Sequence, residues 1–565
     1  MGTAAMTGNL LEIQGLSVSY RTRTGLAQAV RSVDLAIAPG EIVALVGESG
    51  SGKSTTAHAV TGLLPAAGRI DAGRILFGGH DLAALREKEL RAVRGAQIGL
   101  IPQDPGVSLN PVQRIGTQVA EVLVIHGLTT RRSAPAAAIE LLDLAGMPDP
   151  ETRARQYPHE LSGGMRQRAL IAIAIAGKPK LIIADEPTSA LDVTVQRLIL
   201  DHIQYLTEEF GTAVLLVTHD LGVAADRAQR IAVMSQGRIV EIGPARDLLE
   251  NPQEPYTRQL LRSAPSLTAA RPRVLKQPVD TEPLVSVENL VKEFPLPLAD
   301  GASRVVRAVD GVSFSLRRGE TLALVGESGS GKSTTARLVL RLAQPTSGTI
   351  SFDGEDVTTS KGARLREIRR RAQLIYQNPY ESLNPRFSIE DVITEPLRVF
   401  RVGDRASRSA RARELLDRVA LPATVLRRRA VELSGGQRQR VAIARALALA
   451  PELVVCDEPV SALDVSVQAQ VLDLFAELQA ETGVAYLFIS HDLAVVRQLA
   501  HRVAVLRQGR IVEIGATDEV FANPAHAYTR ELLAAIPGAG PAGQVPASRL
   551  TTGARSRAAI SSRTT

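Results

Sequence analysis

Two glycine-rich segments hold the residues best suited to chemistry. Residues 45–56 recur letter for letter at residues 324–335. Glycines let a backbone wrap closely around a phosphate with its N–H groups inward, while the lysine reaches the β- and γ-phosphates and the next hydroxyl binds Mg²⁺. The residues expected at a nucleotide are Gly47, Ser49, Gly50, Gly52, Lys53, Ser54 and Thr55, with Gly326, Ser328, Gly329, Gly331, Lys332, Ser333 and Thr334 in the second copy. We call these two segments the phosphate loops.

Two adjacent acids end an apolar run in each copy, Asp185-Glu186 and Asp457-Glu458. Neighbouring buried carboxylates are unfavourable unless a cation offsets them. We expect both aspartates to bind Mg²⁺ and both glutamates to polarise the water that attacks the γ-phosphorus. A solvated strand end would look the same in one copy, but the matched spacing in both favours the catalytic interpretation.

A third repeated motif opens two helical stretches. Ser162-Gly163-Gly164 and Ser434-Gly435-Gly436 each offer a hydroxyl and bare N–H groups to an anion. An ordinary serine N-cap would explain a single copy equally well. Taken with the two preceding motifs, these segments resemble the signature motif of ABC ATPases. The resemblance implies an ATPase in which each serine contacts the γ-phosphate of an ATP held by the opposite copy.

The resemblance assigns further roles. It implies that Gln103 and Gln377 contact Mg²⁺ and the attacking water, and that His219 and His491 bond the γ-phosphate. It also implies that residues 189–192 and 461–464 let the two copies sense each other. Tyr20 and Phe294 are expected either to stack on adenine or to fill the core. Met165 stands where the second copy has Gln437, so the site that uses Ser162 is expected to be slower, because a lost amide removes hydrogen bonds of about 1 kcal/mol each.

The elements that position these motifs alternate along the chain. Short apolar runs at 42–46, 181–184 and 214–217 read as buried strands, separated by longer helical stretches. This pattern predicts a mostly parallel sheet wrapped by helices, with ligands at the carboxyl ends of its strands. The expected fold is α/β, with two tandem ABC-type P-loop domains. The resemblance gives each domain a sheet core, a β-rich subdomain and a helical subdomain.

The internal duplication sets the domain boundaries. A repeat of this length indicates two whole domains, since solenoid repeats run to about 20–50 residues. We expect domains at 9–263 and 284–537, joined by a polar, proline-containing linker at 264–283. Residues 538–565 carry arginines without acids among small polar residues. They read as a disordered tail, with weak contact to anionic lipid as the alternative.

Composition excludes several classes of protein. The net charge is +7, but 66 basic and 59 acidic residues are intermixed, which argues against a nucleic-acid binder. The single cysteine, Cys456, excludes a disulfide framework and a four-cysteine iron–sulfur cluster, and reads as a buried small hydrophobe. The sequence has no run of about 18 apolar residues and no signal-peptide plan, so a cytoplasmic location is expected.

Two further segments indicate which process the ATP hydrolysis would power. Residues 251–261 and 523–533 resemble the C-terminal extension of oligopeptide/dipeptide/nickel importer ATPases, and residues 108–111 and 382–385 also match that group. The two extensions differ at two matching positions. The second copy has Ala527 where the first has Pro255, and the first has Glu254 where the second has His526. The resemblance implies the energy-supplying subunit of a dipeptide or oligopeptide importer, peripheral on the cytoplasmic face of the membrane. One chain, paired internally, would serve two permease subunits and an extracytoplasmic solute-binding protein.

The alternative from another class is a tandem-cassette ATPase that acts on ribosomes or DNA. Such proteins carry a long, charged, helical linker, whereas residues 266–283 are short and broken by prolines. A role without hydrolysis is disfavoured by Glu186 and Glu458. The cargo stays open among dipeptides, longer peptides, glutathione and nickel chelates.

Overall fold

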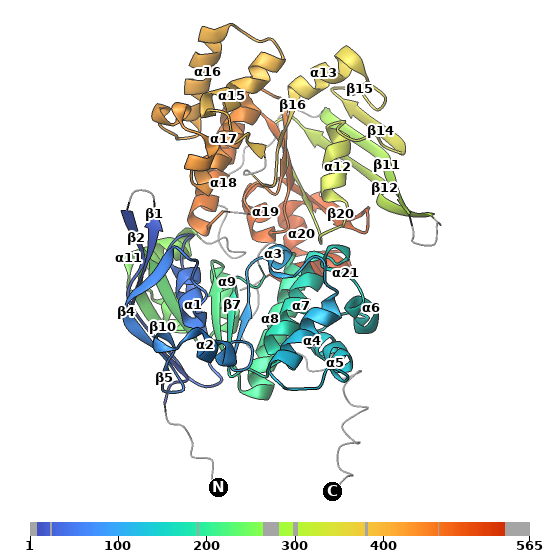
Figure 1. The fold of residues 1–565 in the computed structure, drawn as a ribbon. Helices are drawn as coiled ribbons and strands as arrows, with labels where there is room; N and C mark the ends of the chain where they lie inside the picture. The colour runs from blue at the N-terminus through green and yellow to red at the C-terminus, as the bar shows by residue number, and fades with distance from the viewer. Residues whose placement is uncertain are drawn as a thin grey trace.

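The computed structural model describes residues 8–22, 25–188, 191–263, 282–297, 303–378, 382–461 and 463–536. The predicted tail at 538–565 lies outside the described residues, as does the predicted linker except for its last two residues. Ser189, Ala190 and Ala462, from the two loops expected to sense the opposite copy, also lie outside them. Two halves of the same architecture follow each other along the chain (Figure 1).

The first half contains a four-stranded sheet in the order β2-β1-β4-β5 and a six-stranded sheet in the order β10-β9-β3-β8-β7-β6. Its strands are β1 (Leu11–Thr22), β2 (Gly25–Ile37), β3 (Ile42–Val46), β4 (Gly68–Phe77), β5 (His80–Asp81), β6 (Ile98–Ile101), β7 (Leu181–Asp185), β8 (Ala213–Thr218), β9 (Arg230–Ser235) and β10 (Arg238–Pro244). Its helices are α1 (Lys53–Thr61), α2 (Glu87–Val93), α3 (Pro105–Ser108), α4 (Ile115–Ile125), α5 (Ala134–Leu144), α6 (Pro150–Ala154), α7 (Gly163–Ile175), α8 (Val193–Phe210), α9 (Leu221–Arg227), α10 (Ala245–Glu250) and α11 (Pro255–Ser263).

The second half repeats this plan, with sheets in the orders β12-β11-β14-β15 and β16-β17-β18-β13-β19-β20. Its strands are β11 (Pro283–Pro297), β12 (Ser303–Arg317), β13 (Thr321–Val325), β14 (Ser347–Phe352), β15 (Glu355–Asp356), β16 (Ala372–Ile375), β17 (Leu453–Asp457), β18 (Ala485–Ile489), β19 (Arg502–Arg507) and β20 (Arg510–Ala516). Its helices are α12 (Lys332–Val339), α13 (Gly362–Arg371), α15 (Ile389–Val399), α16 (Arg405–Arg418), α17 (Gly435–Ala446), α18 (Val465–Thr482), α19 (Leu493–Leu499), α20 (Thr517–Ala522) and α21 (Ala527–Ala534).

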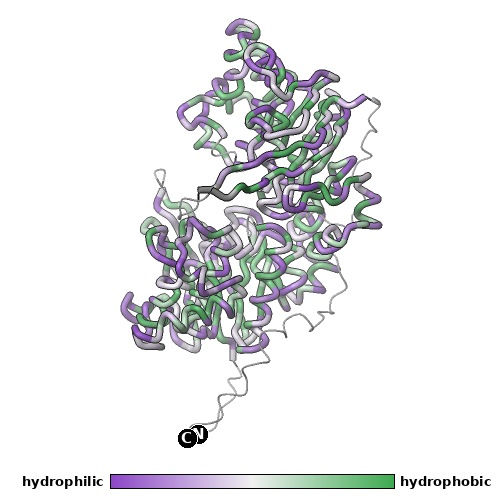
Figure 2. Tube along the Cα trace, turned by 90° about the vertical axis from the view of Figure 1, so that its right-hand side faces the viewer, coloured by the Kyte–Doolittle hydropathy of each residue, from purple (hydrophilic) through white to green (hydrophobic). Residues whose placement is uncertain are grey.

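The six-stranded sheets confirm the predicted parallel core. Strands β6, β7, β8, β3 and β9 pair in parallel, and only the edge strand β10 runs antiparallel. Every residue of β3 is buried, because both faces of the sheet are covered. Val43 and Leu45 pack with α1 and the four-stranded sheet, whereas Ile42 packs with α7 and α8. Hydrophobic stretches accordingly run through the interior of both halves in Figure 2.

Cys456 confirms the prediction of a buried small hydrophobe. It lies in β17 with no exposed surface, and burial raises the pKa of its thiol well above the usual value. Among the described residues, no helix combines the length and the apolar character that a bilayer crossing requires.

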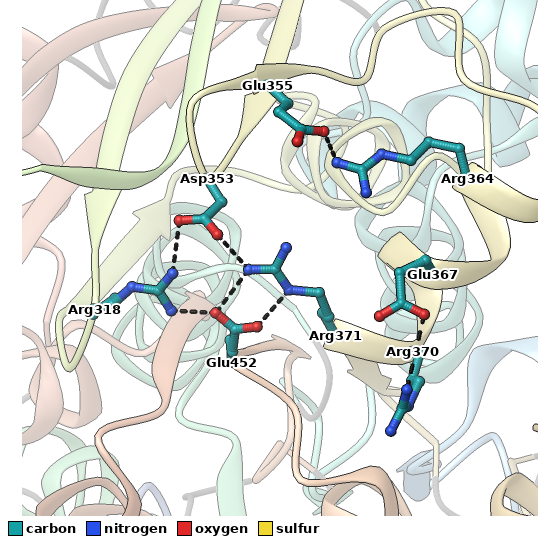
Figure 3. Close-up of polar contacts among 8 residues, drawn as sticks. All are labelled: Arg318, Asp353, Glu355, Arg364, Glu367, Arg370, Arg371 and Glu452. Carbon is teal, nitrogen blue, oxygen red and sulfur yellow. Dashed lines mark hydrogen bonds and ion pairs between the residues drawn. The ribbon is translucent and has the colours of Figure 1, made fainter. Parts of the chain in front are cut away.

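One charged cluster is found in the second half only (Figure 3). The guanidinium groups of Arg318 and Arg371 both contact the carboxylates of Asp353 and Glu452, with Arg318 Nη2 to Asp353 Oδ1 at 2.7 Å and Arg371 Nη2 to Asp353 Oδ2 at 2.6 Å. The cluster joins the β14–β15 turn to the starts of β13 and β17. The equivalent places in the first half hold Pro39, Gly78, Gln97 and Lys180, which cannot form it.

We expect Glu452→Gln to lower the Tm by about 2–4 °C at pH 7, which corresponds to about 1 kcal/mol for a partly exposed network. The hydrogen bond from Arg371 lowers the pKa of Glu452 below its ordinary 4.5. The stabilisation is therefore complete above about pH 4.5 and is lost as the pH falls through the folded-state pKa. Calorimetry of both proteins should show their Tm values converging below that pH.

The control is Glu89→Gln, because Glu89 belongs to an exposed surface pair with Arg86 and its loss should not move the Tm. A Tm difference at Glu452 that stayed constant down to pH 3 would assign the effect to packing instead of charge.

Candidate active site

Each phosphate loop follows the first buried strand of its parallel sheet and is shaped by glycines. Gly47 has φ 151°, and a Cβ there would lie 2.1 Å from the carbonyl oxygen of Met234. Gly326 repeats this with φ 145° and 2.2 Å to the carbonyl of Leu506. Only glycine therefore lets the loop approach the neighbouring strand. Helices α1 and α12 begin at the lysines without a side-chain cap, so their first N–H groups are available to an anion.

The loop lysines are buried and folded against their own loops. Lys53 Nζ donates to the carbonyl oxygens of Gly47 and Glu48 at 2.7 and 2.9 Å. Lys332 Nζ makes the same contacts with Gly326 and Glu327 at 2.7 and 2.8 Å. Burial lowers the pKa of both lysines, and nearby carboxylates oppose that effect in part. The predicted phosphate-binding residues thus share one loop in each half.

A hydroxyl and a carboxylate meet beside each loop. Ser54 Oγ donates to Asp185 Oδ1 at 3.0 Å, and Ser333 Oγ donates to Asp457 Oδ1 at 2.9 Å. Burial raises the pKa of both aspartates, and the adjacent glutamates add to this. A buried carboxylate held against a hydroxyl is an oxygen donor set that suits Mg²⁺, which would relieve the cost of burying the charge. The residues present therefore fit the predicted ion.

Glu186 and Glu458 are held in an uncommon backbone conformation. Their φ values are 47° and 48°, in the left-handed region that costs a non-glycine residue about 1–3 kcal/mol. The conformation turns each carboxylate towards two partners. Glu186 accepts from Gln103 Nε2 at 2.8 Å and lies 3.3 Å from His219 Nδ1, and Glu458 lies 2.8 Å from Gln377 Nε2 and 3.2 Å from His491 Nδ1.

These contacts set the charge of the glutamates. Burial raises the pKa of Glu186, but the hydrogen bond from His219 and the nearby cations outweigh it, so the net shift is downward. Glu458 behaves in the same way with His491. Conversely, burial lowers the pKa of each histidine, and its glutamate raises the pKa by more. The carboxylates are therefore ionised at neutral pH, as a group that accepts a proton from water must be.

The histidines were predicted to bond the γ-phosphate, and in the structure each contacts the glutamate of its own half. Both glutamates, both histidines and the following Asp220 and Asp492 line one cavity of about 160 Å³ between the halves. The two predicted catalytic centres therefore face a shared space.

Hydrogen bonds across the halves join each phosphate loop to the opposite half. Thr194 Oγ1 donates to Glu327 Oε1 at 3.0 Å, and Ser328 N donates to Asp192 Oδ2 at 3.2 Å. Ser466 Oγ donates to the Glu48 carboxylate in the other loop. Asp192 caps α8, and Thr194 and Ser466 lie in the first turns of α8 and α18. Thr194 and Ser466 occupy matching places in the two copies, but neither belongs to a motif that marks it as functional in the sequence.

The signature serines cap their own helices. Ser162 Oγ accepts from Met165 N, and Ser434 Oγ accepts from Gln437 N, each at 3.3 Å. Gln437 Oε1 in turn accepts from Ser434 N at 3.2 Å, which Met165 cannot do. Within the described residues, the crossed hydrogen bonds at the loops come from α8 and α18. The crossed contact of Ser162, Gly163, Gly164, Ser434, Gly435 and Gly436 with phosphate thus stays a prediction.

The two aromatic candidates differ in their surroundings. Tyr20 is half-buried, and its hydroxyl lies 3.2 Å from Thr55 Oγ1 at the start of α1. Phe294 is 43% exposed, and the ammonium of Lys292 lies 5.2 Å from its ring centre. Neither is a fully buried core residue, and stacking on adenine stays a prediction for both.

Comparison with known families finds the same two-fold repeat. The model described as "ABC transporter" matches residues 30–189 and 309–461. The model described as "Oligopeptide/dipeptide transporter, C-terminal region" matches residues 240–288 and 512–560. Both matches occur once in each half.

Two relatives align along almost the whole chain. The glutathione import ATP-binding protein GsiA of Pectobacterium atrosepticum is 46% identical over 561 residues, which cover 94% of this chain and 90% of the relative. GsiA of Escherichia coli K12 is 45% identical over 568 residues, with 95% and 91% covered. Among solved structures, a dimeric post-hydrolysis ATP-binding cassette bound to ADP and Pi is 29% identical, over 41% of this chain and 98% of that one, with a TM-score of 0.38.

Proposed function

The chain belongs to the ABC transporter family as an ATP-hydrolysing importer subunit with two cassettes, and from this premise we propose that it powers the import of dipeptides or oligopeptides across the cytoplasmic membrane. The observation that supports a peptide as the cargo is the match to the oligopeptide/dipeptide transporter C-terminal region, which occurs twice, at residues 240–288 and 512–560. Small peptides are the class to which glutathione, the cargo named for the relatives, also belongs.

The geometry supports a division of labour at each ATP. The loop N–H groups and Lys53 would bind the phosphates, and Gln103 would orient the attacking water beside Glu186. The Glu186 carboxylate would take the proton of that water, and His219 would hold the carboxylate in place. Mg²⁺ held by Ser54, Asp185 and Gln103 would supply neutralisation of the phosphate charge. Lys332, Ser333, Gln377, Asp457, Glu458 and His491 would act in the same way in the second half.

Exposed apolar residues at matching places in the two halves support two permease partners. In the second half a groove of about 550 Å³ is lined by apolar residues that include Leu342, Tyr376 and Val399, the last of which is 53% exposed, and also by Arg366, Arg369 and Arg445. The equivalent residues of the first half, Leu63 and Ile125, are 46% and 69% exposed. Exposed apolar side chains beside Gln377 suit a helix from a membrane partner. The chain would then lie on the cytoplasmic face of the membrane, one copy for two permeases and a solute-binding protein.

Co-purification tests this proposal. The full chain, carrying an affinity tag in its source organism, is expected to be recovered from detergent-solubilised membranes with two permease subunits. The double variant Ile125→Asp/Val399→Asp should lose the permeases because it places charge on both apolar faces, while its basal ATPase activity is retained. Phe210→Asp, at an exposed residue at the far end of α8, is the matched control and should keep them. Recovery with ribosomes or DNA alone would favour the other class of ABC protein.

A further inference from the structure

The C-terminal extension of each half reaches the phosphate loop of that half. The Tyr256 hydroxyl accepts a hydrogen bond from the backbone N–H of Glu48 at 3.2 Å. The Tyr528 hydroxyl accepts one from Glu327 N–H at 3.1 Å. Tyr528 is only 1% exposed, and burial raises its pKa to about 12, so its hydroxyl is protonated at neutral pH. The same contact is therefore made twice, from segments about 200 residues away along the chain.

Each tyrosine is held in place by contacts from the last strands of its own half. The Glu513 carboxylate in β20 accepts from the N–H groups of Ala525 and His526 at 2.8 and 3.0 Å, which fixes the start of α21. The Arg507 guanidinium lies 4.7 Å from the ring centre of Tyr528. Glu241 anchors the turn before α11 in the same way, through Gln253 N at 2.8 Å. These contacts fix the positions of the two tyrosine side chains.

The same extension also touches the opposite half. Arg197 Nη1 of α8 donates to the carbonyl of Ala534 at the end of α21 at 2.8 Å, and Val193 of α8 packs in the apolar cluster that contains Tyr528. Figure 1 shows α21 beside α8. Glu327 therefore donates its backbone N–H to the Tyr528 hydroxyl, and its carboxylate accepts a hydrogen bond from Thr194 of the opposite half.

A phosphate loop needs such restraint. Gly326 has a φ that side-chain-bearing residues rarely adopt, and glycine is free to leave it. If the Gly326–Glu327 peptide rotated, the N–H groups that follow would no longer converge on a phosphate. The hydrogen bond from the N–H of Glu327 to the Tyr528 hydroxyl opposes that rotation before nucleotide binds.

We propose that Tyr256 and Tyr528 are positioning residues for ATP binding, which fix the Gly47–Glu48 and Gly326–Glu327 peptides of their phosphate loops, respectively. This rests on the phosphate-binding role proposed for the loops. The tyrosines touch no reacting atom in this scheme, so they affect ATP affinity and leave the chemical step unchanged.

The test removes only the hydroxyl. In the full chain, Tyr528→Phe is expected to raise the Kd for ATP of the second site, and its KM, about three- to tenfold, the effect of one hydrogen bond, with little change in kcat. In the nucleotide-free protein, hydrogen–deuterium exchange should accelerate in the peptide that contains Glu327 and stay unchanged in the one that contains Glu48. The two peptides must extend to Leu322 and Val43, where the copies differ in sequence. Tyr256→Phe should give the reverse pattern.

The control is Tyr205→Phe, at a 39% exposed residue on α8, which should change neither exchange nor affinity. Unchanged exchange at Glu327 with a lower Tm would assign Tyr528 to packing and overturn the proposal, as would unchanged ATP affinity. Because these measurements need no permease, failure here is separate from failure of the import function. If Tyr528→Phe does not fold, Arg197→Ala, which removes the contact with α21 from the other half, should accelerate the same exchange; no acceleration would also overturn the proposal.

Discussion

Replacing both Glu186 and Glu458 with glutamine is expected to lower ATP turnover about 10²–10⁴-fold while ATP stays bound. Glutamine keeps the size of the side chain and can still contact Gln103 and His219, but it cannot take a proton from water. Phosphate release measures the loss of turnover, and filter binding of labelled ATP measures retention. Undiminished hydrolysis in this variant would remove the glutamates from the mechanism.

The single variants separate the two sites. The contacts around Glu186 and Glu458 differ by no more than 0.1 Å, so each site is expected to be competent. Met165 stands beside Ser162, the serine predicted to serve the second loop, so that site is expected to be slower. Glu186→Gln should therefore cost more activity than Glu458→Gln. The reverse order would contradict the role given to Met165.

A second large effect is expected on ATP retention in variants that test which serine contacts the phosphate held by each loop. In the crossed scheme, Lys53 and Ser434 belong to one site, and Lys332 and Ser162 to the other. Losing a charge-assisted contact with phosphate weakens affinity on the order of a hundredfold. In the Glu186→Gln/Glu458→Gln background, adding Lys53→Ala and Ser434→Ala damages one site, so about one ATP per chain should stay bound. Adding Lys53→Ala and Ser162→Ala damages both sites, so trapping should be largely lost.

The two combinations are matched controls for each other, because each removes one lysine and one serine hydroxyl. Nucleotide counted after rapid desalting distinguishes them. Equal retention by the two combinations would contradict the crossed pairing, and the opposite order would indicate that each half uses its own serine.

The parallel sheet and its strand-end acids were predictable from sequence because they depend on local pattern. Fully apolar runs such as residues 42–46 are typical of strands in a parallel sheet that is covered on both faces. The carboxyl ends of such parallel strands meet at one edge of the sheet. The pairing of Ser54 with Asp185 agrees with that rule, since Ser54 follows β3 and Asp185 ends β7, two parallel strands with only β8 between them. The second copy carries the same strand-end acids and the same phosphate loop, so the same inferences apply to it.

The contacts that were missed depend on features that sequence does not carry. Nothing in the residue types around Glu186 signals a φ of 47°, yet that conformation directs its carboxylate towards His219. Tyr256 and Tyr528 lie in extensions that the sequence analysis identified only by resemblance. Their roles could not be predicted, because their partners lie in loops about 200 residues away. Gln437 was considered for its effect on the ATP site, and in the structure its side chain also completes the cap of its own helix.

In the proposed mechanism ATP is held between the halves, with the phosphate loop of one half facing the serine-glycine helix start of the other. The most direct measurement is a crystal or cryo-EM structure of the Glu186→Gln/Glu458→Gln chain trapped with ATP and Mg²⁺. We expect Ser434 Oγ and Ser162 Oγ to lie within hydrogen-bond distance of the γ-phosphates held by Lys53 and Lys332, respectively. ATP bound to the loops with both serines far from any phosphate would contradict it.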